Sequence, residues 1–177
     1  MREGKGSTYE GGLREPCIVR WPGHVPAGRV SDAIFSTLDL LPTFGNLAGF
    51  KPPTDRIIDG VDQTDLILGK SDPGARDHFY YFCQNELHAV RKGIWKLILP
   101  NWQRFYGYVK DKGSNKIELY DLKTDIGETR NVAKERPEIV KDLLKLAKSF
   151  QWPDHLPEPS ITLPEANAAT NRVVKSK

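Results

Sequence analysis

The stretch that decides the fold is Leu87-His-Ala-Val-Arg-Lys-Gly-Ile-Trp-Lys-Leu-Ile-Leu99. Two apolar runs, 87–91 and 94–99, flank the dipeptide Lys92-Gly93, which predicts a β-hairpin with a tight turn. Residues 78–83, before this hairpin, are rich in aromatic side chains, and residues 117–122, after it, are again apolar. Strands joined by tight turns pair antiparallel, so we expect a small antiparallel sheet of about four strands.

A helix is predicted directly after this sheet. Pro137 suits the first turn of a helix, and apolar residues then recur at helical spacing. They are Val140, Leu143, Leu144, Ala147 and Phe150. One helix can cover one face of a small sheet, so the sequence predicts an α+β fold. The remaining residues, 151–177, contain several prolines and predict a loose segment on the surface.

The N-terminal half predicts less regular structure. Cys17–Trp21 is a short apolar run that ends at a Pro-Gly dipeptide, and it predicts a buried strand. A second extended piece is predicted for residues 30–35, a helix with one apolar face for residues 39–49, and a shorter helix for residues 62–69. Residues 70–77 predict a linker.

Composition excludes several classes of protein. The chain has 26 Lys and Arg against 23 Asp and Glu, and a net charge of +3 argues against a dedicated nucleic-acid binder. Residues 102–116 do interleave aromatic with cationic side chains, a pattern that can bind single strands. We favour a long hairpin loop there and expect no nucleic-acid partner. No apolar stretch is long enough for a membrane span.

The residue types that carry chemistry are scattered. Two cysteines are too few for a disulfide framework or a zinc site, and the four histidines lack ligand spacing. The segment Gly4-Lys5-Gly6-Ser7-Thr8 places an ammonium and backbone N–H groups where an anion could bind. It is not a P-loop, because Gly6 follows the lysine where that motif needs Ser or Thr. Taken alone, this segment predicts a flexible N-terminus.

Read in order, these segments resemble the sulfatases, especially the arylsulfatase branch of the alkaline-phosphatase-like superfamily. The resemblance begins with residues 4–16, GKGSTYEGGLREP, and covers the chain to about residue 148. It continues through Trp21-Pro22-Gly23, Ser36–Gly49, Asp59–Asp62, Ala89–Arg91, Trp95–Leu97, Leu119–Leu122 and Asp125–Glu128. As an ordered set these motifs are highly specific, whereas any one alone would be weak.

The resemblance implies the C-terminal part of a sulfuric ester hydrolase. Residues 1–75 would be the end of its α/β catalytic domain, residues 76–150 its C-terminal subdomain of four antiparallel strands and a helix, and residues 151–177 a Pro-rich tail. Lys5 would be the catalytic lysine that binds the sulfate, and Thr8 a second substrate contact. Glu10 and Arg14 are expected to be structural, pairing to hold the glycine-rich turn.

The chain departs from the family at the reactive centre. Sulfatases use a formylglycine made from Cys or Ser in a C/S-x-P-x-R motif, but neither Cys17 nor Cys83 is followed by that proline. The family's calcium ligands are also missing, so we expect no metal site in this chain. Calcium and formylglycine are expected in a parent enzyme, with neither supplied here, and the chain alone is predicted to be inactive.

The implied partners are a sulfate ester and a missing N-terminal sulfatase domain, which would cover an exposed apolar patch. Members of the family are usually periplasmic, secreted or lysosomal. Two alternatives stay open at this point. One is a sulfatase-like module that binds or scaffolds without catalysis. The other is a piece of a phosphodiesterase or phosphonate monoester hydrolase of the same superfamily.

Overall fold

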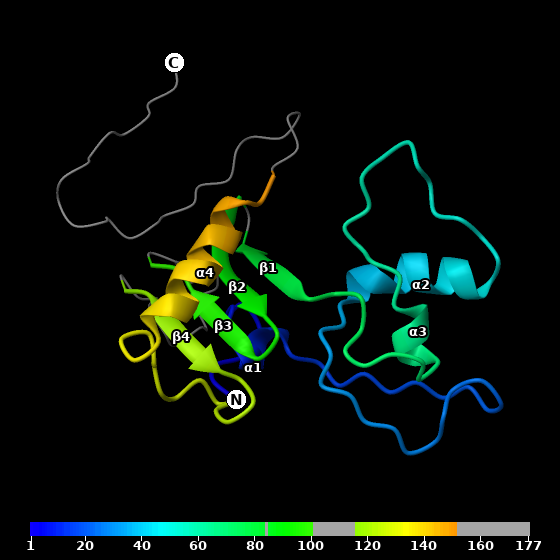
Figure 1. The fold of residues 1–177 in the computed structure, drawn as a ribbon, viewed down its shortest axis with the longest axis horizontal. Coiled ribbons are helices and arrows are strands. Elements are labelled where there is room, and N and C mark those ends of the chain that lie inside the picture. The colour runs from blue at the N-terminus through cyan, green and yellow to red at the C-terminus, as the bar shows by residue number, and fades with distance from the viewer. Residues whose placement is uncertain (84, 101–115, 152–177) are drawn as a thin grey trace. The chain divides into compact units, whose positions relative to one another are not determined.

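The computed structural model describes residues 1–83, 85–100 and 116–151 and contains two compact units (Figure 1). The first, here called the sheet unit, combines Met1–Arg14 with the chain from Tyr80 onward. The second, the helical unit, is Glu15–Phe79. The predicted long loop and the Pro-rich tail lie almost entirely outside the described residues. The assignment of residues 1–75 to the catalytic domain of a parent enzyme stays a prediction.

The sheet unit is built on four strands in the order β1-β2-β3-β4. They are β1 (His78–Cys83), β2 (Glu86–Lys92), β3 (Trp95–Ile98) and β4 (Glu118–Asp121). β2 and β3 pair antiparallel with Ala89 opposite Ile98, and β3 and β4 pair antiparallel with Lys96 opposite Tyr120. Gly93 turns the hairpin with a φ of 55°, a conformation that glycine adopts easily. The predicted hairpin and the antiparallel sheet are confirmed.

Helix α4 (Pro137–Lys148) covers one face of this sheet. Its Leu143 and Ala147 are buried against Val90 of β2, Leu97 of β3 and Leu119 of β4. The helix has proline in its first turn and lysines in its last, where they complement the helix dipole. The predicted α+β arrangement of sheet and C-terminal helix is therefore confirmed.

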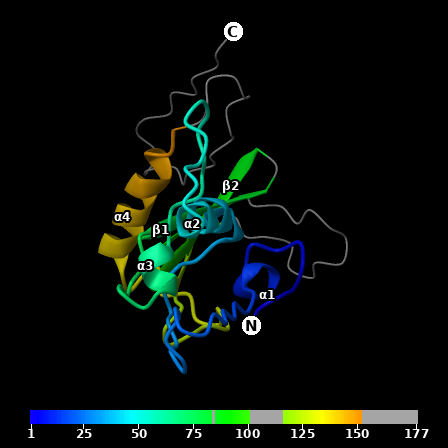
Figure 2. The same ribbon diagram turned by 90° about the vertical axis from the view of Figure 1, so that its right-hand side faces the viewer.

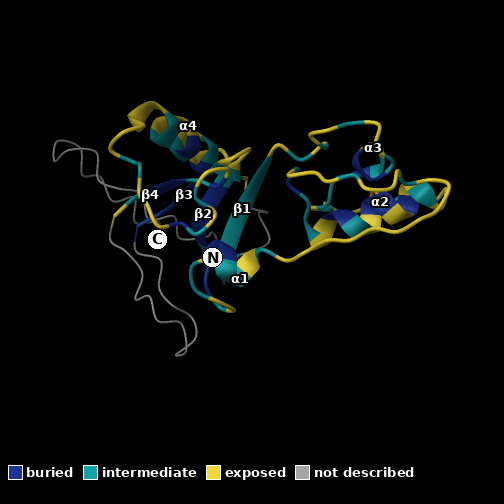
Figure 3. Ribbon diagram, turned by 90° about the horizontal axis from the view of Figure 1, so that it is seen from below, coloured by how far each residue is buried: buried dark blue, intermediate teal, exposed yellow. Residues whose placement is uncertain are grey.

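The opposite face of the sheet is covered by the first residues of the chain. Figures 2 and 3 show α4 and the short helix α1 (Glu10–Leu13) on opposite sides of the strands. The ring of Tyr9 is fully buried in a cluster with Ala89, Ile98 and Tyr120. The sheet is thus sandwiched between segments that are far apart in sequence, and α1 was not predicted.

The helical unit contains a 3₁₀ turn (Thr37–Asp39), α2 (Leu40–Leu47) and α3 (Thr64–Ile67). Its interior is rich in polar groups. The Gln63 backbone N–H donates to Thr43 Oγ1 at 2.9 Å, and its side-chain amide donates to the Ile34 carbonyl at 3.2 Å. Buried polar groups stabilise a fold only when they are paired in this way. Across the described residues, no helix is long and apolar enough to cross a membrane.

Asp39 is the central residue of the helical unit and is fully buried. Its Oδ2 accepts from the Ser36 backbone N–H at 2.9 Å, and its Oδ1 accepts from the Val61 N–H at 2.9 Å. The guanidinium of Arg76 binds both carboxylate oxygens. Burial opposes ionisation of Asp39, but these donors outweigh it and hold the pKa of Asp39 below its ordinary value.

Two predictions for the N-terminal half are wrong. Cys17–Trp21 forms no strand and is exposed throughout, and residues 30–35 form none either. An apolar run becomes a buried strand only when neighbouring strands pair with it, and no described strand does so. The predicted helix forms, but Pro42, Thr43 and Gly45 face inward while Leu41 and Phe44 of its apolar stripe are exposed.

Replacing the buried Leu143 with alanine should destabilise the sheet unit by about 2–5 kcal/mol, because the missing side-chain atoms would leave a cavity between α4 and the sheet. Urea unfolding followed by circular dichroism measures this change. Lys145→Ala, on the exposed side of the same helix, is the matched control and should change stability by less than about 0.5 kcal/mol. Equal midpoints for the two variants would contradict the packing.

Replacing Asp39 with asparagine should destabilise the chain by about 3 kcal/mol near pH 7, because Arg76 would lose its buried partner. Folding lowers the pKa of Asp39 from its ordinary value of 3.8. The ionised carboxylate therefore stabilises the fold above pH 3.8, and this stabilisation is lost as the pH falls through the lower pKa of the folded state. The difference between wild type and Asp39→Asn in urea unfolding should therefore shrink on acidification from about pH 5. A difference that grows would contradict this assignment.

Candidate functional site

The candidate site is a closed loop of residues 2–12, here called the lysine loop, with Lys5 at its turn. Its two ends are joined by a hydrogen bond in which the Gly11 N–H donates to the Arg2 carbonyl at 3.0 Å. Inside it, the Ser7 N–H donates to the Gly4 carbonyl at 3.2 Å. Lys5 is exposed, so its ammonium is accessible from outside the loop.

Two adjacent glycines allow the loop to close. A Cβ atom on Gly11 would lie 2.1 Å from the Glu3 carbonyl oxygen, and one on Gly12 would lie 2.2 Å from the Ser7 carbonyl oxygen. No side chain fits at such distances, because the obstructing atoms belong to the backbone. The Gly-Gly pair after Glu10 is therefore required by the close approach of the two arms of the loop.

The two predicted site residues differ in exposure. Lys5 is exposed, whereas Thr8 is buried and its Oγ1 has no hydrogen-bond partner among the described residues. Ser7 is also buried, and its Oγ accepts from the Tyr9 backbone N–H at 3.1 Å. The structure thus brings Lys5 and Thr8 into one loop but presents Lys5 alone to solvent.

The loop is held to the sheet by three charged groups, here called the charge cluster: Glu10, Lys96 and Glu128. Lys96 Nζ donates a hydrogen bond to Glu10 Oε1 at 2.8 Å. It also forms an ion pair with Glu128 Oε1 at 3.0 Å, whose geometry is not that of a hydrogen bond. Glu128 Oε2 accepts from the Glu10 backbone N–H at 2.6 Å. The side chains of Lys96 and Glu128 are fully buried. The predicted pairing of Glu10 with Arg14 is present at 3.5 Å.

The two carboxyl groups of the cluster titrate differently. Burial opposes ionisation of Glu10, but Lys96, Arg91 and Arg14 outweigh it and hold the pKa of Glu10 below its ordinary value. Burial raises the pKa of Glu128 above its ordinary value. The attraction of Lys96 only partly offsets the effect of burial, and the negative charge of Glu10 raises this pKa further. Both carboxyl groups lie within ion-pair distance of the buried ammonium, and Lys96 favours the ionised form of each.

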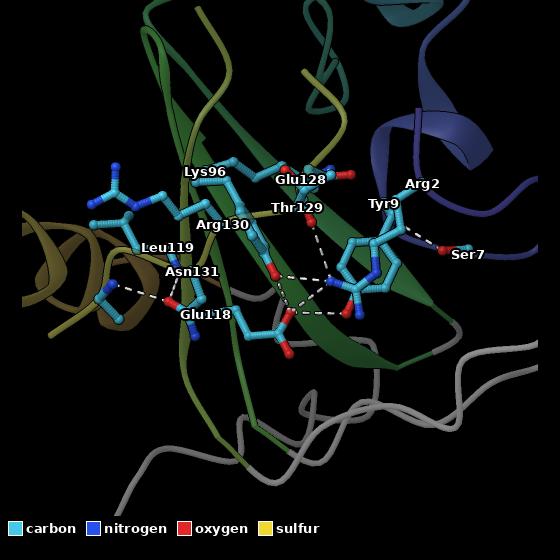
Figure 4. A network of polar contacts seen from close by, with 12 residues as sticks. Arg2, Ser7, Tyr9, Lys96, Glu118, Leu119, Glu128, Thr129, Arg130 and Asn131 are labelled. Carbon is cyan, nitrogen blue, oxygen red and sulfur yellow. Dashed lines mark hydrogen bonds and ion pairs between the residues drawn. The ribbon is translucent and has the colours of Figure 1, made fainter. Parts of the chain in front are cut away.

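A second polar network lies beside the charge cluster and is centred on Glu118 of β4 (Figure 4). The hydroxyls of Tyr9 and Tyr120 both donate to Glu118 Oε2 at 2.8 Å. Arg2 donates to the Tyr120 hydroxyl at 2.9 Å, and its guanidinium stacks 3.8 Å from the centre of the Tyr9 ring. The network thus fixes both arms of the lysine loop to the same strand.

The backbone at Glu128 adopts a conformation that disfavours side chains. Its φ is 52°, in the left-handed region that glycine prefers and that costs other residues about 1–2 kcal/mol. Asp125 supports this turn, since its carboxylate accepts from the Thr129 and Arg130 N–H groups at 2.8 Å each. A glutamate persists at this strained position because its side chain contacts both Glu10 and Lys96.

Sequence reasoning missed Lys96, Glu118 and Glu128. The sequence predicted a cover for one face of the sheet only, so a lysine that alternates with apolar residues in a strand was expected on the solvent side. Which acids would meet it could not be predicted, because Glu10 and Glu128 are 86 and 32 residues away along the chain.

The described residues offer neither of the family's reactive groups. Cys17 is exposed, and Cys83 is half-buried with a pKa raised by burial and by Glu86. Both are free thiols. Residues 1–83, 85–100 and 116–151 contain no cluster of three or more His, Cys, Asp or Glu side chains that could hold a metal ion. The residues present therefore do not fit a calcium site.

The fold and this loop define a sulfatase C-terminal region. A family model described as N-sulphoglucosamine sulphohydrolase, C-terminal, matches residues 4–151, and the chain belongs to this family. The match includes residues 4–12 of the lysine loop, the four strands and α4. The resemblance predicted from the ordered motifs is confirmed.

Named relatives and solved structures agree with this assignment. The chain is 48% identical over 99 residues to the N-acetylgalactosamine-6-sulfatase of Mus musculus and 36% identical over 153 residues to the N-acetylgalactosamine-6-O-sulfatase of Bacteroides thetaiotaomicron. These matches cover 56% and 85% of this chain but 19% and 30% of those proteins. The steryl-sulfatase of Mus musculus is 40% identical over 106 residues, covering 60% of this chain and 16% of that protein.

A solved Bacteroides thetaiotaomicron structure from work on the metabolism of multiple glycosaminoglycans superposes with a TM-score of 0.71 at 36% identity. A sulfatase from Pseudoalteromonas sp. gives a TM-score of 0.70 at 25% identity. Each superposition covers 84% of this chain and 31% of the other. The chain therefore spans less than a third of the length of these sulfatases.

Replacing Gly11 with alanine should open the lysine loop, because the new methyl group would collide with backbone on the opposite arm. We expect a loss of about 1–3 kcal/mol in urea unfolding. Gly4→Ala is the matched control in the same loop: a Cβ there meets nothing within 4 Å. If Gly11→Ala is as stable as Gly4→Ala, the loop is not closed as described.

Proposed function

We propose that this chain is part of a sulfatase that hydrolyses sulfate esters, to which it contributes the sulfate-binding Lys5 and the C-terminal sheet. The observation that carries the proposal is the match of residues 4–151 to one C-terminal sulfatase family, with Lys5 inside the matched region. The relatives' names support sulfate-ester hydrolysis as the reaction class. They include sulfatases of sugars and of steroids, so the proposal stays at the level of sulfate esters.

Lys5 suits the charge that the reaction develops. Breaking a sulfate ester places negative charge on the sulfuryl and leaving-group oxygens. A fixed ammonium stabilises that charge, and more strongly where water is excluded. Lys5 is exposed at the turn of a loop that Glu10 anchors to Lys96 of the sheet. A further part of the enzyme could therefore enclose Lys5 together with the substrate. Thr8 is the second candidate contact, but its hydroxyl is covered and would reach a substrate only if the loop opened.

The nucleophile and the metal would come from residues outside this chain. Neither cysteine stands in the C-x-P-x-R motif that yields formylglycine, and the described residues do not fit calcium. A parent sulfatase would supply both groups. The role of this chain is to place a cation beside the sulfate.

The N-terminal part of that sulfatase is the proposed partner of the helical unit. Apolar side chains of this unit are exposed to a degree that is unusual for residues of their kind: Ile18 by 91%, Val30 by 88% and Ile57 by 82%. Leu41 and Phe44 on α2 are exposed by about half. Exposed apolar side chains of this size favour a covering partner, and this is the support that they give the proposal. The relatives have ample further chain to cover it, because these residues match less than a third of their length.

The test uses the full-length protein and measures inorganic sulfate released from nitrophenyl sulfate, a 6-sulfated N-acetylhexosamine and a steroid sulfate. Lys5→Ala should lower kcat/KM for the cleaved substrate by about 10²–10³, the loss typical of one donor to a developing oxyanion. Lys123→Ala removes an exposed lysine from a different turn and should leave kcat/KM unchanged.

Two outcomes would contradict the proposal. One is unchanged kinetics in Lys5→Ala. The other is turnover of nitrophenyl phosphate or a phosphodiester in preference to every sulfate ester, which would favour the phosphodiesterase branch. The 177-residue chain alone should release no sulfate, since it has no formylglycine motif.

A further inference from the structure

The charge cluster joins the proposed sulfate-binding residue to a sheet that otherwise has no part in the reaction. Lys5 lies five residues before Glu10, and Glu10 is held by Lys96 of β3 and by Glu128. The lysine loop is closed on itself by its own backbone hydrogen bonds, so fixing Glu10 fixes the whole loop. The position of Lys5 is therefore set from β3.

We propose that Lys96 and Glu128 are positioning residues for the sulfatase reaction, acting through Glu10 to hold Lys5 in place. The inference rests on the proposed function of Lys5. Neither residue touches a substrate in this account, because both side chains are fully buried. Their role is to prevent the loop from moving when the sulfuryl group acquires charge.

Three observations favour positioning over a general contribution to the core. The polar groups meet at the boundary between the lysine loop and the sheet, whereas the face under α4 is packed with apolar side chains. Glu128 keeps a glutamate in a backbone conformation suited to glycine, which indicates that its side chain is needed there. Glu3, on the arm opposite Gly11, also has a positive φ of 56°, so strain is concentrated in this loop and its anchor.

The geometry also explains why a salt bridge is used here. A hydrophobic contact between loop and sheet would permit sliding, because it is not directional. Glu10 is fixed instead at two points, its carboxylate on Lys96 and its backbone N–H on Glu128. A displacement of about 1 Å at a reacting centre can cost about 10²-fold in rate. Two-point attachment restricts such displacement.

A double-mutant cycle in the full-length enzyme tests the inference. Lys96→Met and Glu128→Ala are each measured in the wild-type and Lys5→Ala backgrounds, with kcat and KM determined separately on the cleaved sulfate ester. In the wild-type background each should lower kcat by about 10-fold to 10²-fold with little change in KM. In the Lys5→Ala background each should have less than about a twofold effect, because the positioned group is gone.

Leu143→Ala is the matched control, since it weakens the same unit from the opposite face of the sheet. It should leave kcat unchanged below its unfolding temperature. Glu128→Ala removes the acceptor of the Glu10 N–H and leaves the Lys96–Glu10 pair in place, so it carries the test if Lys96→Met does not fold. Equal losses in both backgrounds, or full kcat in Glu128→Ala, would overturn the positioning role. If Lys5→Ala itself retains full activity, the proposed function fails instead.

Discussion

The sheet unit depends on one buried ion pair, between Lys96 of β3 and Glu10 of the lysine loop. An unpaired ammonium in this position would carry a desolvation cost of several kcal/mol, so the loop and the strand stabilise each other. The pair joins the first 14 residues to a sheet that begins more than sixty residues later. It acts there together with the packing of Tyr9 on the same face of the sheet.

This arrangement gives the two faces of the sheet different tasks. The face beneath α4 is apolar and supplies stability through Leu143, Ala147 and their neighbours. The face beneath the lysine loop combines the cluster around Tyr9 with buried charged groups, and these groups supply orientation because ion pairs and hydrogen bonds are directional. A small sheet can thus act as a rigid support for a loop that belongs to a different part of the sequence.

The sequence predicted local structure well and distant contacts poorly. The hairpin around Lys92-Gly93 and the helix from Pro137 follow from spacing, turn chemistry and apolar periodicity within short windows. The strand predicted at Cys17–Trp21 failed because its burial depended on a neighbour that the described chain does not provide. Lys5 was found through its motif, whereas Lys96 and Glu128 are linked to it only in three dimensions. The motif suggested a candidate residue, and the structure was needed to find what holds it.

Hydrogen exchange of the peptide 1–14 in wild type and in Lys96→Met measures this anchoring most directly, with the α4 peptide 137–148 as internal reference. Loss of the buried pair should speed exchange in residues 1–14 by about 10²-fold and leave α4 within about twofold of wild type. Unchanged protection of residues 1–14, or an equal acceleration in both peptides, would contradict the claim that Lys96 holds the lysine loop on the sheet.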